Sequence, residues 1–193
     1  MRAQVALFRE DKGLGRLDLA KAFEVVSDSI RRATLDSSKQ MAGAGIPHAL
    51  VGGLAVGAHG WPRATKDVDF LVGSEAWVRH PSGIVTPNPG LPLEAHGVAI
   101  DSIPLREDEP FLRAAIESPL STPEGVPVVP VEVLVYLKLK SPRARDEVDV
   151  IELVRSGADV ARIRSYLAAN SPGLIERFGA MAARARADDE AEG

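Results

Sequence analysis

The sequence predicts an α+β (mixed α/β) fold, in which helices flank a small sheet and a further helical segment follows at the C-terminal end. Apolar residues recur at spacings of three and four near the start and again from residue 131 onward, which is typical of amphipathic helices. Short apolar runs, typical of buried strands, lie between these regions. Because these runs do not alternate regularly with helices, we do not expect a doubly wound parallel sheet.

The first expected element is a helix over residues 17–44, which follows a weakly ordered start over residues 1–17. Its apolar positions follow helical spacing, at Leu19, Phe23, Val26, Ile30 and Ala33. Gly43 and Gly45 end the pattern, because glycine is common just past a helix end.

A buried strand and a short helix are expected next. Residues 48–51 form an apolar run that ends at Gly52 and Gly53, and residues 54–59 have the length of one or two helical turns. Gly60 follows at the position where glycine commonly closes a helix. The chain therefore predicts a strand, a glycine pair and a helix in direct succession.

The middle of the chain predicts two strands separated by a long loop. Residues 67–72 read as a strand after a polar connection, and residues 97–103 read as another. Residues 79–95 hold four prolines and read as loop.

The remaining elements are mostly helical. We expect a helix over residues 107–117 and a short strand over residues 127–129. Four helices then follow, over residues 131–140, 143–155, 158–169 and 171–187, and the chain closes with a solvated acidic tail.

Length and composition set outer limits on function. The 193 residues suffice for about one domain, which buries roughly 70% of its unfolded surface. Cysteine is absent, which excludes disulfides, thiol catalysis and cysteine-bound metal clusters. The first apolar stretch ends at Phe8 and no later run has the length of a membrane span, so we expect a cytoplasmic protein without membrane contact. A net charge of −4 means that a nucleic-acid or nucleotide partner needs a local site.

Three aspartates are candidate metal ligands. Asp67 and Asp69 stand two apart on the predicted strand, so their side chains share one face while Val68 and Phe70 face the core. Neighbouring carboxylates repel unless they share a cation, and Mg²⁺ prefers such oxygen ligands. Asp101, on the next strand, can complete a three-carboxylate cluster that holds two metal ions. The plainer interpretation is that these are solvated strand residues.

The glycine pair and the connection after it are candidates for phosphate binding. Gly52 and Gly53 lead from a strand into a helix, where free backbone N–H groups bind phosphate and missing Cβ atoms allow close approach. Arg63 and Thr65 can add a cation and a hydroxyl. Each of these features alone is common in ordinary turns and loops.

Other catalytic motifs are absent from the sequence. It contains no P-loop, no dinucleotide-binding glycine fingerprint, no zincin helix and no nucleophile elbow. Its four histidines, at positions 48, 59, 80 and 96, form no metal-ligand spacing, and we assign none of them to catalysis.

The segment from residue 45 to residue 72 resembles the DNA polymerase β-like nucleotidyltransferase superfamily. The resemblance lies in an apolar residue and a glycine pair, a spacer, and then an alternating acid pair, here Val51-Gly52-Gly53 and Asp67-Val68-Asp69-Phe70. The sequence is most similar to bacterial AbiEii-like proteins, which include toxins of type IV toxin–antitoxin systems. These proteins often carry Arg-x-Thr before the acid pair and a later Lys-x4-Arg-x2-Asp-x2-Asp run, matched here by Lys138, Arg143, Asp146 and Asp149.

The resemblance implies a fold and an activity. It implies a nucleotidyltransferase-type sheet and metal-dependent transfer of a nucleoside monophosphate from an NTP such as ATP to an acceptor hydroxyl, with release of pyrophosphate. The metal would be Mg²⁺, with Mn²⁺ as the alternative.

The resemblance also implies residue roles. Asp67, Asp69 and Asp101 would hold the metals, and Asp101 would also help activate the acceptor. Gly52 and Gly53 would hold the phosphates, with Arg63 and Thr65 beside them, while Lys138 and Asp146 would complete the nucleotide site. From spacing alone, Arg143, Asp146 and Asp149 share a helix face and can simply pair with one another.

The acceptor stays open among three classes. The first is RNA, specifically a tRNA 3′ end, with a cognate antitoxin as partner; the second is a small molecule such as an antibiotic, and the third is a protein side chain. A non-catalytic nucleotide-binding partner in a toxin–antitoxin pair is a further alternative. Ser141-Pro142 and Gly53 depart from the pattern of many relatives, and Gly53 leaves the acceptor class in doubt. The C-terminal arginines can form an RNA-facing surface or merely solvated helix faces; they are Arg143, Arg145, Arg155, Arg162, Arg164, Arg177, Arg184 and Arg186.

The resemblance and the element pattern together divide the chain into three parts. We expect an N-terminal helical segment over residues 1–44, a nucleotidyltransferase core over residues 45–155, and C-terminal helices with the acidic tail over residues 156–193.

Overall fold

The structure of the protein is a computed structural model that describes the backbone of residues 17–192 and the side chains of residues 17–187. The weakly ordered start expected over residues 1–17 lies outside the described residues except for Leu17. The side chains of the acidic tail lie outside them as well, although the backbone of the tail is helical as far as Glu192.

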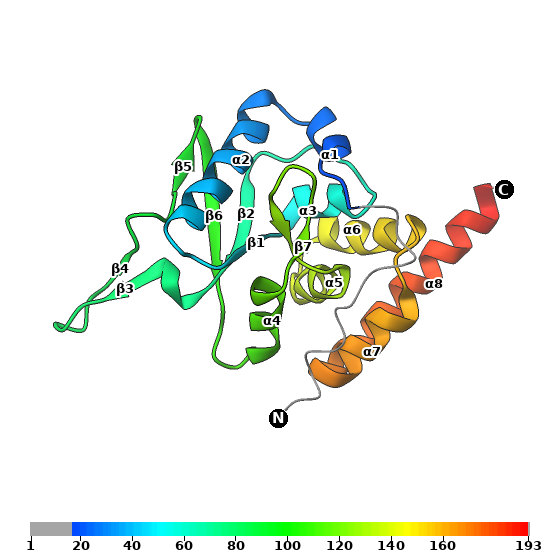
Figure 1. The fold of residues 1–193 in the computed structure, drawn as a ribbon. Helices are drawn as coiled ribbons and strands as arrows, with labels where there is room; N and C mark the ends of the chain where they lie inside the picture. Colours follow the sequence, from blue (N-terminus) through cyan, green and yellow to red (C-terminus); the bar gives the residue numbers. More distant parts are fainter. Residues whose placement is uncertain (1–16, 193) are drawn as a thin grey trace.

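A six-stranded mixed sheet lies between helices, which confirms the predicted mixed α/β class (Figure 1). Its strands pair in parallel between β2 and β6 and between β1 and β8, and in antiparallel fashion elsewhere. In spatial order the strands are β5 (Glu94–Ala95), β6 (Val98–Pro104), β2 (Val68–Val72), β1 (His48–Leu50), β8 (Pro127–Val128) and β7 (Leu120–Ser121).

The prediction of a continuous loop over residues 79–95 is wrong. Strands β3 (Trp77–Arg79) and β4 (Val85–Pro87) form a hairpin that projects from the body of the molecule (Figure 1), and β5 follows within the same segment. The sequence pattern missed these strands for two reasons. They are only two or three residues long, and the prolines around them indicate loop, although Pro87 stands at a strand end, where proline is tolerated. Strand β7 is too short to carry a periodic signal and was not expected.

The single helix expected over residues 17–44 is instead two helices, α1 (Ala20–Glu24) and α2 (Asp28–Gly43). The break falls at Ser27, whose hydroxyl oxygen accepts a hydrogen bond from the backbone N–H of Ile30 and so caps α2. A serine side chain can hydrogen-bond the backbone in place of a helical partner, so one helix can end and another begin at Ser27. The apolar spacing continues across this boundary and does not reveal it. Helix α2 packs against β1, β2, β5 and β6.

Helix α3 (Gly52–Ala58) begins at the glycine pair itself, two residues earlier than expected, and Gly60 follows it with a positive φ of 112°. The helix expected over residues 107–117 is shorter, with a 3₁₀ turn η3 (Pro110–Leu112) that leads into α4 (Arg113–Glu117). The C-terminal helices lie close to their predicted positions and are α5 (Val131–Lys140), α6 (Ala144–Arg155), α7 (Val160–Asn170) and α8 (Ile175–Glu192). A 3₁₀ turn, η4 (Pro172–Leu174), precedes α8.

The core of the protein is centred on the two middle strands. Val68 and Phe70 are 0% exposed, which confirms that they face inward. The ring of Phe70 meets the imidazole of buried His48 edge to face, with 5.6 Å between centroids. None of the helices in the described part of the chain combines the length and the apolar character that a membrane span needs.

Truncation of Phe70 should destabilise the protein strongly. Phe70→Ala leaves a cavity between helices and sheet, so we expect a loss of about 3–5 kcal/mol in the free energy of unfolding, measured by urea titration. Ile84→Ala, on the exposed hairpin, should change it by less than about 0.5 kcal/mol. Equal losses in the two variants would contradict this assignment of the core.

Candidate metal centre

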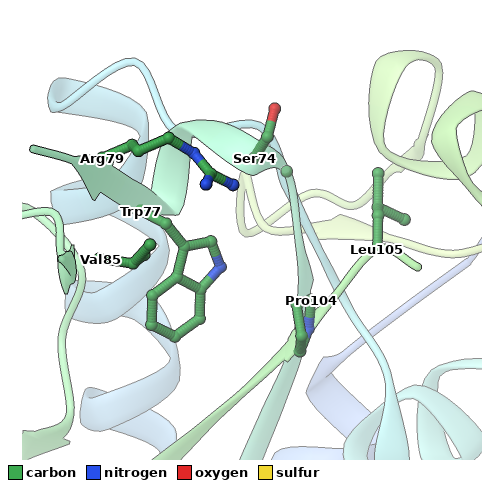
Figure 2. Close-up of a pocket in the computed structure, with 7 residues that line it drawn as sticks. Ser74, Trp77, Arg79, Val85, Pro104 and Leu105 are labelled. Carbon is green, nitrogen blue, oxygen red and sulfur yellow. The ribbon is translucent and has the colours of Figure 1, made fainter. Parts of the chain in front are cut away.

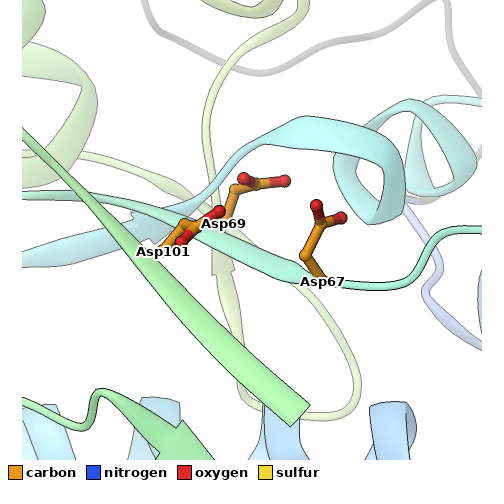
Figure 3. Close-up of side chains that lie close together, drawn as sticks. All are labelled: Asp67, Asp69 and Asp101. Atoms are coloured by element: carbon orange, nitrogen blue, oxygen red, sulfur yellow. The ribbon is translucent and has the colours of Figure 1, made fainter.

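Three carboxylates converge beside the paired strands β2 and β6. Asp69 lies within β2, and the parallel register pairs it directly with Asp101 of β6. Asp67 is the residue just before β2, so the expected position of both acids on the strand itself holds for Asp69 alone. Figure 3 shows the three carboxyl groups beside one another, and one oxygen from each lies within 4.8 Å of the others. The fold therefore brings together the three acids that the sequence singled out.

The negative charges of this cluster act on one another. Burial, followed by the charges of Asp67 and Asp101, raises the pKa of Asp69 to about 6, while Lys138 and Arg143 act in the opposite direction. A carboxyl group that resists ionisation because of its acidic neighbours is relieved by a shared cation. Three hard oxygen donors at this spacing fit a divalent cation such as Mg²⁺.

The glycine pair packs directly behind the acids. Gly52 has a φ of +67°, and a Cβ atom on it would lie 1.9 Å from Oδ2 of Asp69. A Cβ atom on Gly53 would approach the Arg63 guanidinium at 3.0 Å and the Thr65 hydroxyl at 3.1 Å. Gly52 is therefore required both by its backbone conformation and by the space that Asp69 occupies.

The connection over residues 61–67 reaches the acids through Thr65. The hydroxyl of Thr65 donates a hydrogen bond of 2.7 Å to Oδ1 of Asp67. That bond leaves the second oxygen of Asp67 free of Thr65 and orients the carboxyl group. Thr65 is thus placed to position Asp67.

The guanidinium of Arg63, which the sequence suggested for phosphate binding, pairs with a carboxylate of the protein. Its Nε and Nη2 atoms donate a bidentate pair of hydrogen bonds to Asp149, at 2.6 and 2.7 Å, and Nη1 donates to the carbonyl of Ala64. Asp149 is 0% exposed and lies on α6. In this structure the guanidinium anchors the connection over residues 61–67 to α6.

Lys138 completes this network from α5. Its ammonium nitrogen lies 2.5 Å from Oδ1 of Asp146 and 2.7 Å from Oδ2 of Asp149. Burial opposes ionisation of Asp146, but the hydrogen bonds from Lys138 and Ser141 hold the pKa of Asp146 below its usual value. The two acids of α6 therefore pair with Lys138 and, for Asp149, with Arg63. We call Arg63, Lys138, Asp146 and Asp149 the anchoring network.

Asp149 is the member of this network whose role the sequence left open. Its sequence signals are its place at the end of the Lys-x4-Arg-x2-Asp-x2-Asp run and its position on one helix face with Arg143 and Asp146. Its partner Arg63 stands far away in the chain, so only the tertiary structure identifies the pair.

Several C-terminal arginines have partners within the protein. Arg155 pairs with Glu152, Arg162 with Glu132 and Arg177 with Glu147. Arg177 also donates to the backbone carbonyls of the α5–α6 junction. Arg162 and Arg177 therefore join neighbouring helices, while Arg155 pairs with an acid of its own helix, α6.

Comparisons with known proteins show a likeness to a solved structure. The sequence matches no protein-family model, and no curated protein matches it. A crystal structure of an antigenic nucleotidyltransferase-like protein from Paracoccidioides brasiliensis aligns with 80% of this chain and 94% of its own, at 13% identity and a TM-score of 0.44.

Loss of Asp149 should cost far more stability than loss of a surface acid on the same helix. Asp149→Ala removes the shared partner of Arg63 and Lys138, so we expect the free energy of unfolding to fall by about 3–5 kcal/mol. Glu147→Ala breaks a half-exposed pair with Arg177 and should cost at most about 1 kcal/mol. Urea unfolding of both variants checks this, and a similar cost for the two would contradict a buried anchoring role.

The pH dependence of stability should report the strained carboxyl group. In the folded state the pKa of Asp69 is about 6, above the ordinary aspartate value of 3.8, so in chelating buffer the protein loses stability as the pH rises between these two values. Asp69→Asn should therefore gain stability relative to the parent from pH 4 to pH 7, by roughly 1–3 kcal/mol.

Asp36→Asn is the matched control, with the opposite sign. The hydrogen bond with His96 lowers the pKa of Asp36, so this variant should lose stability relative to the parent as the pH rises toward 3.8, and the difference should then stay level from pH 4 to pH 7. Urea unfolding in steps of one pH unit measures both slopes. A flat difference between Asp69→Asn and the parent would refute the predicted electrostatic cost.

Proposed function

We propose that this protein is a metal-dependent nucleotidyltransferase, which moves a nucleoside monophosphate from an NTP to an acceptor hydroxyl and releases pyrophosphate. The observation that carries the proposal is the convergence of Asp67, Asp69 and Asp101 beside Gly52 and Gly53. The resemblance of the acid and glycine spacing to the DNA polymerase β-like superfamily supports the same reaction class.

Asp67, Asp69 and Asp101 would hold Mg²⁺, or Mn²⁺ as the alternative. Their mutual distances support this assignment, because they reflect a concentration of negative charge. The pKa of Asp69, raised by burial and then by the charges of Asp67 and Asp101, supports it as well. When bound, the cation supplies Lewis-acid stabilisation of the charge that develops on the reacting phosphate.

The chain's own residues position and deprotonate the acceptor. In the proposed step the acceptor oxygen attacks the α-phosphorus of the NTP while the bond from that phosphorus to the bridging oxygen breaks, and pyrophosphate departs. Asp101, the most exposed of the three acids, accepts the hydroxyl proton and passes it to solvent. Thr65 keeps the Asp67 carboxyl group oriented throughout.

The phosphates are assigned to the side of the site that carries the glycines. Gly52 and Gly53 carry no Cβ atoms, so a phosphate approaches their backbone closely. Lys138 has three N–H donors, and two carboxylates engage it in this structure. We assign its remaining donor to a nucleotide phosphate and Asp146 to the positioning of Lys138.

RNA is the acceptor that we propose. The proposal includes a toxin-like role, with tRNA as acceptor, a cognate antitoxin as partner and ATP as donor. This part rests on the family resemblance alone. The experiment below distinguishes this proposal from three alternatives: a small hydroxylated molecule as acceptor, a protein as acceptor, and a protein that binds nucleotide without turnover.

Loss of the paired acids should abolish transfer without unfolding the protein. Asp67→Asn combined with Asp69→Asn should lower the rate of label transfer from radiolabelled NTP by more than about a hundredfold, because the metal ligands are lost. The free energy of unfolding should not fall, since the substitutions remove mutual repulsion. The exposed Asp108→Asn variant is the matched control.

The assay contains magnesium, each labelled NTP in turn, and total RNA, a panel of aminoglycosides and lincosamides, or cell lysate. Label in RNA supports the proposed acceptor, and label in a drug or a protein redirects it. Transfer by the double variant at the parental rate would refute the proposed chemistry. Absence of label from every fraction, with NTP binding retained, would support a non-catalytic nucleotide-binding protein instead.

A further inference from the structure

We propose that the pocket at the base of the β3–β4 hairpin is an acceptor subsite that binds an unpaired nucleobase and the adjoining phosphate of a single-stranded RNA end. This inference rests on the proposed function and names the part of the acceptor that the protein grips. It goes beyond that function because the pocket lies outside the acidic cluster and uses none of its residues.

The pocket is next to the C-terminal end of β6, the strand that carries Asp101. Alternate residues of a strand share a face, so Asp101, Ile103 and Leu105 follow one another along one side of β6 and its continuation. Ile103 is 38% exposed, and Leu105 lines the pocket. Four residue steps put the pocket about 13 Å from Asp101 along the strand. An acceptor whose hydroxyl lies at Asp101 can therefore continue over Ile103 into the pocket.

The pocket has the size of a small-ligand site. Its volume is about 380 Å³, which lies within the range of pockets that bind small molecules. Figure 2 shows the indole of Trp77 below the guanidinium of Arg79, with Pro104 and Leu105 across from them. The lining residues are Gly73, Ser74, Trp77, Arg79, Val85, Pro104 and Leu105.

The chemistry of the lining matches a nucleotide unit. Arg79 is the one ionisable side chain among the lining residues, and no carboxylate lines the pocket, so the site favours an anion. Trp77 supplies an aromatic wall, and its buried indole N–H has no hydrogen-bond partner among the described residues. An aromatic platform next to a cation is the combination with which proteins hold single-stranded nucleic acid, because every base has a face to stack and every unit carries a phosphate.

A role in RNA binding would also explain why the β3–β4 hairpin projects from the sheet. The segment from Trp77 to Pro87 extends away from the sheet (Figure 1), and its packing adds little to the core, since Ile84 and Val85 are 60% and 48% exposed. A projecting hairpin that carries an aromatic residue at its base and an arginine beside its turn forms one wall of the path from Asp101.

The test is binding of a fluorescein-labelled single-stranded RNA to the full chain, measured by anisotropy in chelating buffer without NTP. Arg79→Ala should weaken binding and reduce the magnitude of the salt slope, d log K/d log[salt], by about 0.7, the value for one phosphate contact on a single strand. Trp77→Leu should weaken binding roughly tenfold and leave the salt slope unchanged, while Trp77→Phe retains most of the affinity because it keeps a stacking face.

Arg31→Ala is the matched control for charge. Arg31 pairs with Asp28 on α2, and none of the residues that line the pocket belongs to that helix. It should leave both the affinity and the salt slope unchanged. Because Arg79 is exposed, its replacement leaves the fold intact even if Trp77→Leu weakens the hairpin.

The experiment distinguishes failure of the RNA-binding subsite from failure of the proposed nucleotidyl transfer. RNA binding that weakens in the Arg79 and Trp77 variants supports the subsite even if no NTP is ever transferred. Parental affinity in both variants, equal affinity for a blunt RNA duplex, or no binding of RNA to the parent would each overturn the subsite. Transfer to RNA that is untouched by either variant would overturn the subsite while the proposed function stands.

Discussion

The parallel pairing of β2 with β6 is the constraint on which the rest of the site depends. It sets Asp69 opposite Asp101 and holds Asp67 close by, although three carboxylates within 4.8 Å of one another repel. The strands tolerate this repulsion because Val68 and Phe70 anchor the other face of β2 in the core. Packing on one face of a strand thus sustains an electrostatic cost on the other. Burial and then the charges of Asp67 and Asp101 raise the pKa of Asp69.

The anchoring network places the surroundings of the acids. Asp149 receives the guanidinium of Arg63 and lies beside the ammonium of Lys138, so one buried carboxylate ties the connection over residues 61–67 to α5 and α6. Thr65 lies on that connection and orients Asp67, which means that α6 acts on the acid cluster through two side-chain contacts. The cations near the cluster are therefore part of its support, and they are not simply a surface for anions.

Local patterns predicted the elements that form the acid cluster. The strands expected over residues 67–72 and 97–103 are β2 and β6, with bounds that differ by one residue, and the helices expected over residues 131–140 and 143–155 are α5 and α6. Patterns failed where local and tertiary preferences diverged. The apolar spacing over residues 17–44 continued across the capped boundary at Ser27, and prolines masked the short strands of the hairpin within residues 79–95.

The sequence by itself determined the spacing of Asp67 and Asp69, the glycine pair ahead of them, and the alternation that turns Val68 and Phe70 inward, because these depend on backbone periodicity over a few residues. The tertiary structure alone decided that Asp101 lies opposite Asp69, that Asp149 holds Arg63, and that Trp77 and Arg79 line a pocket beyond β6. Each of these contacts joins segments distant in the chain. Their register depends on how the strands and helices pack together, and no local pattern of residues encodes it.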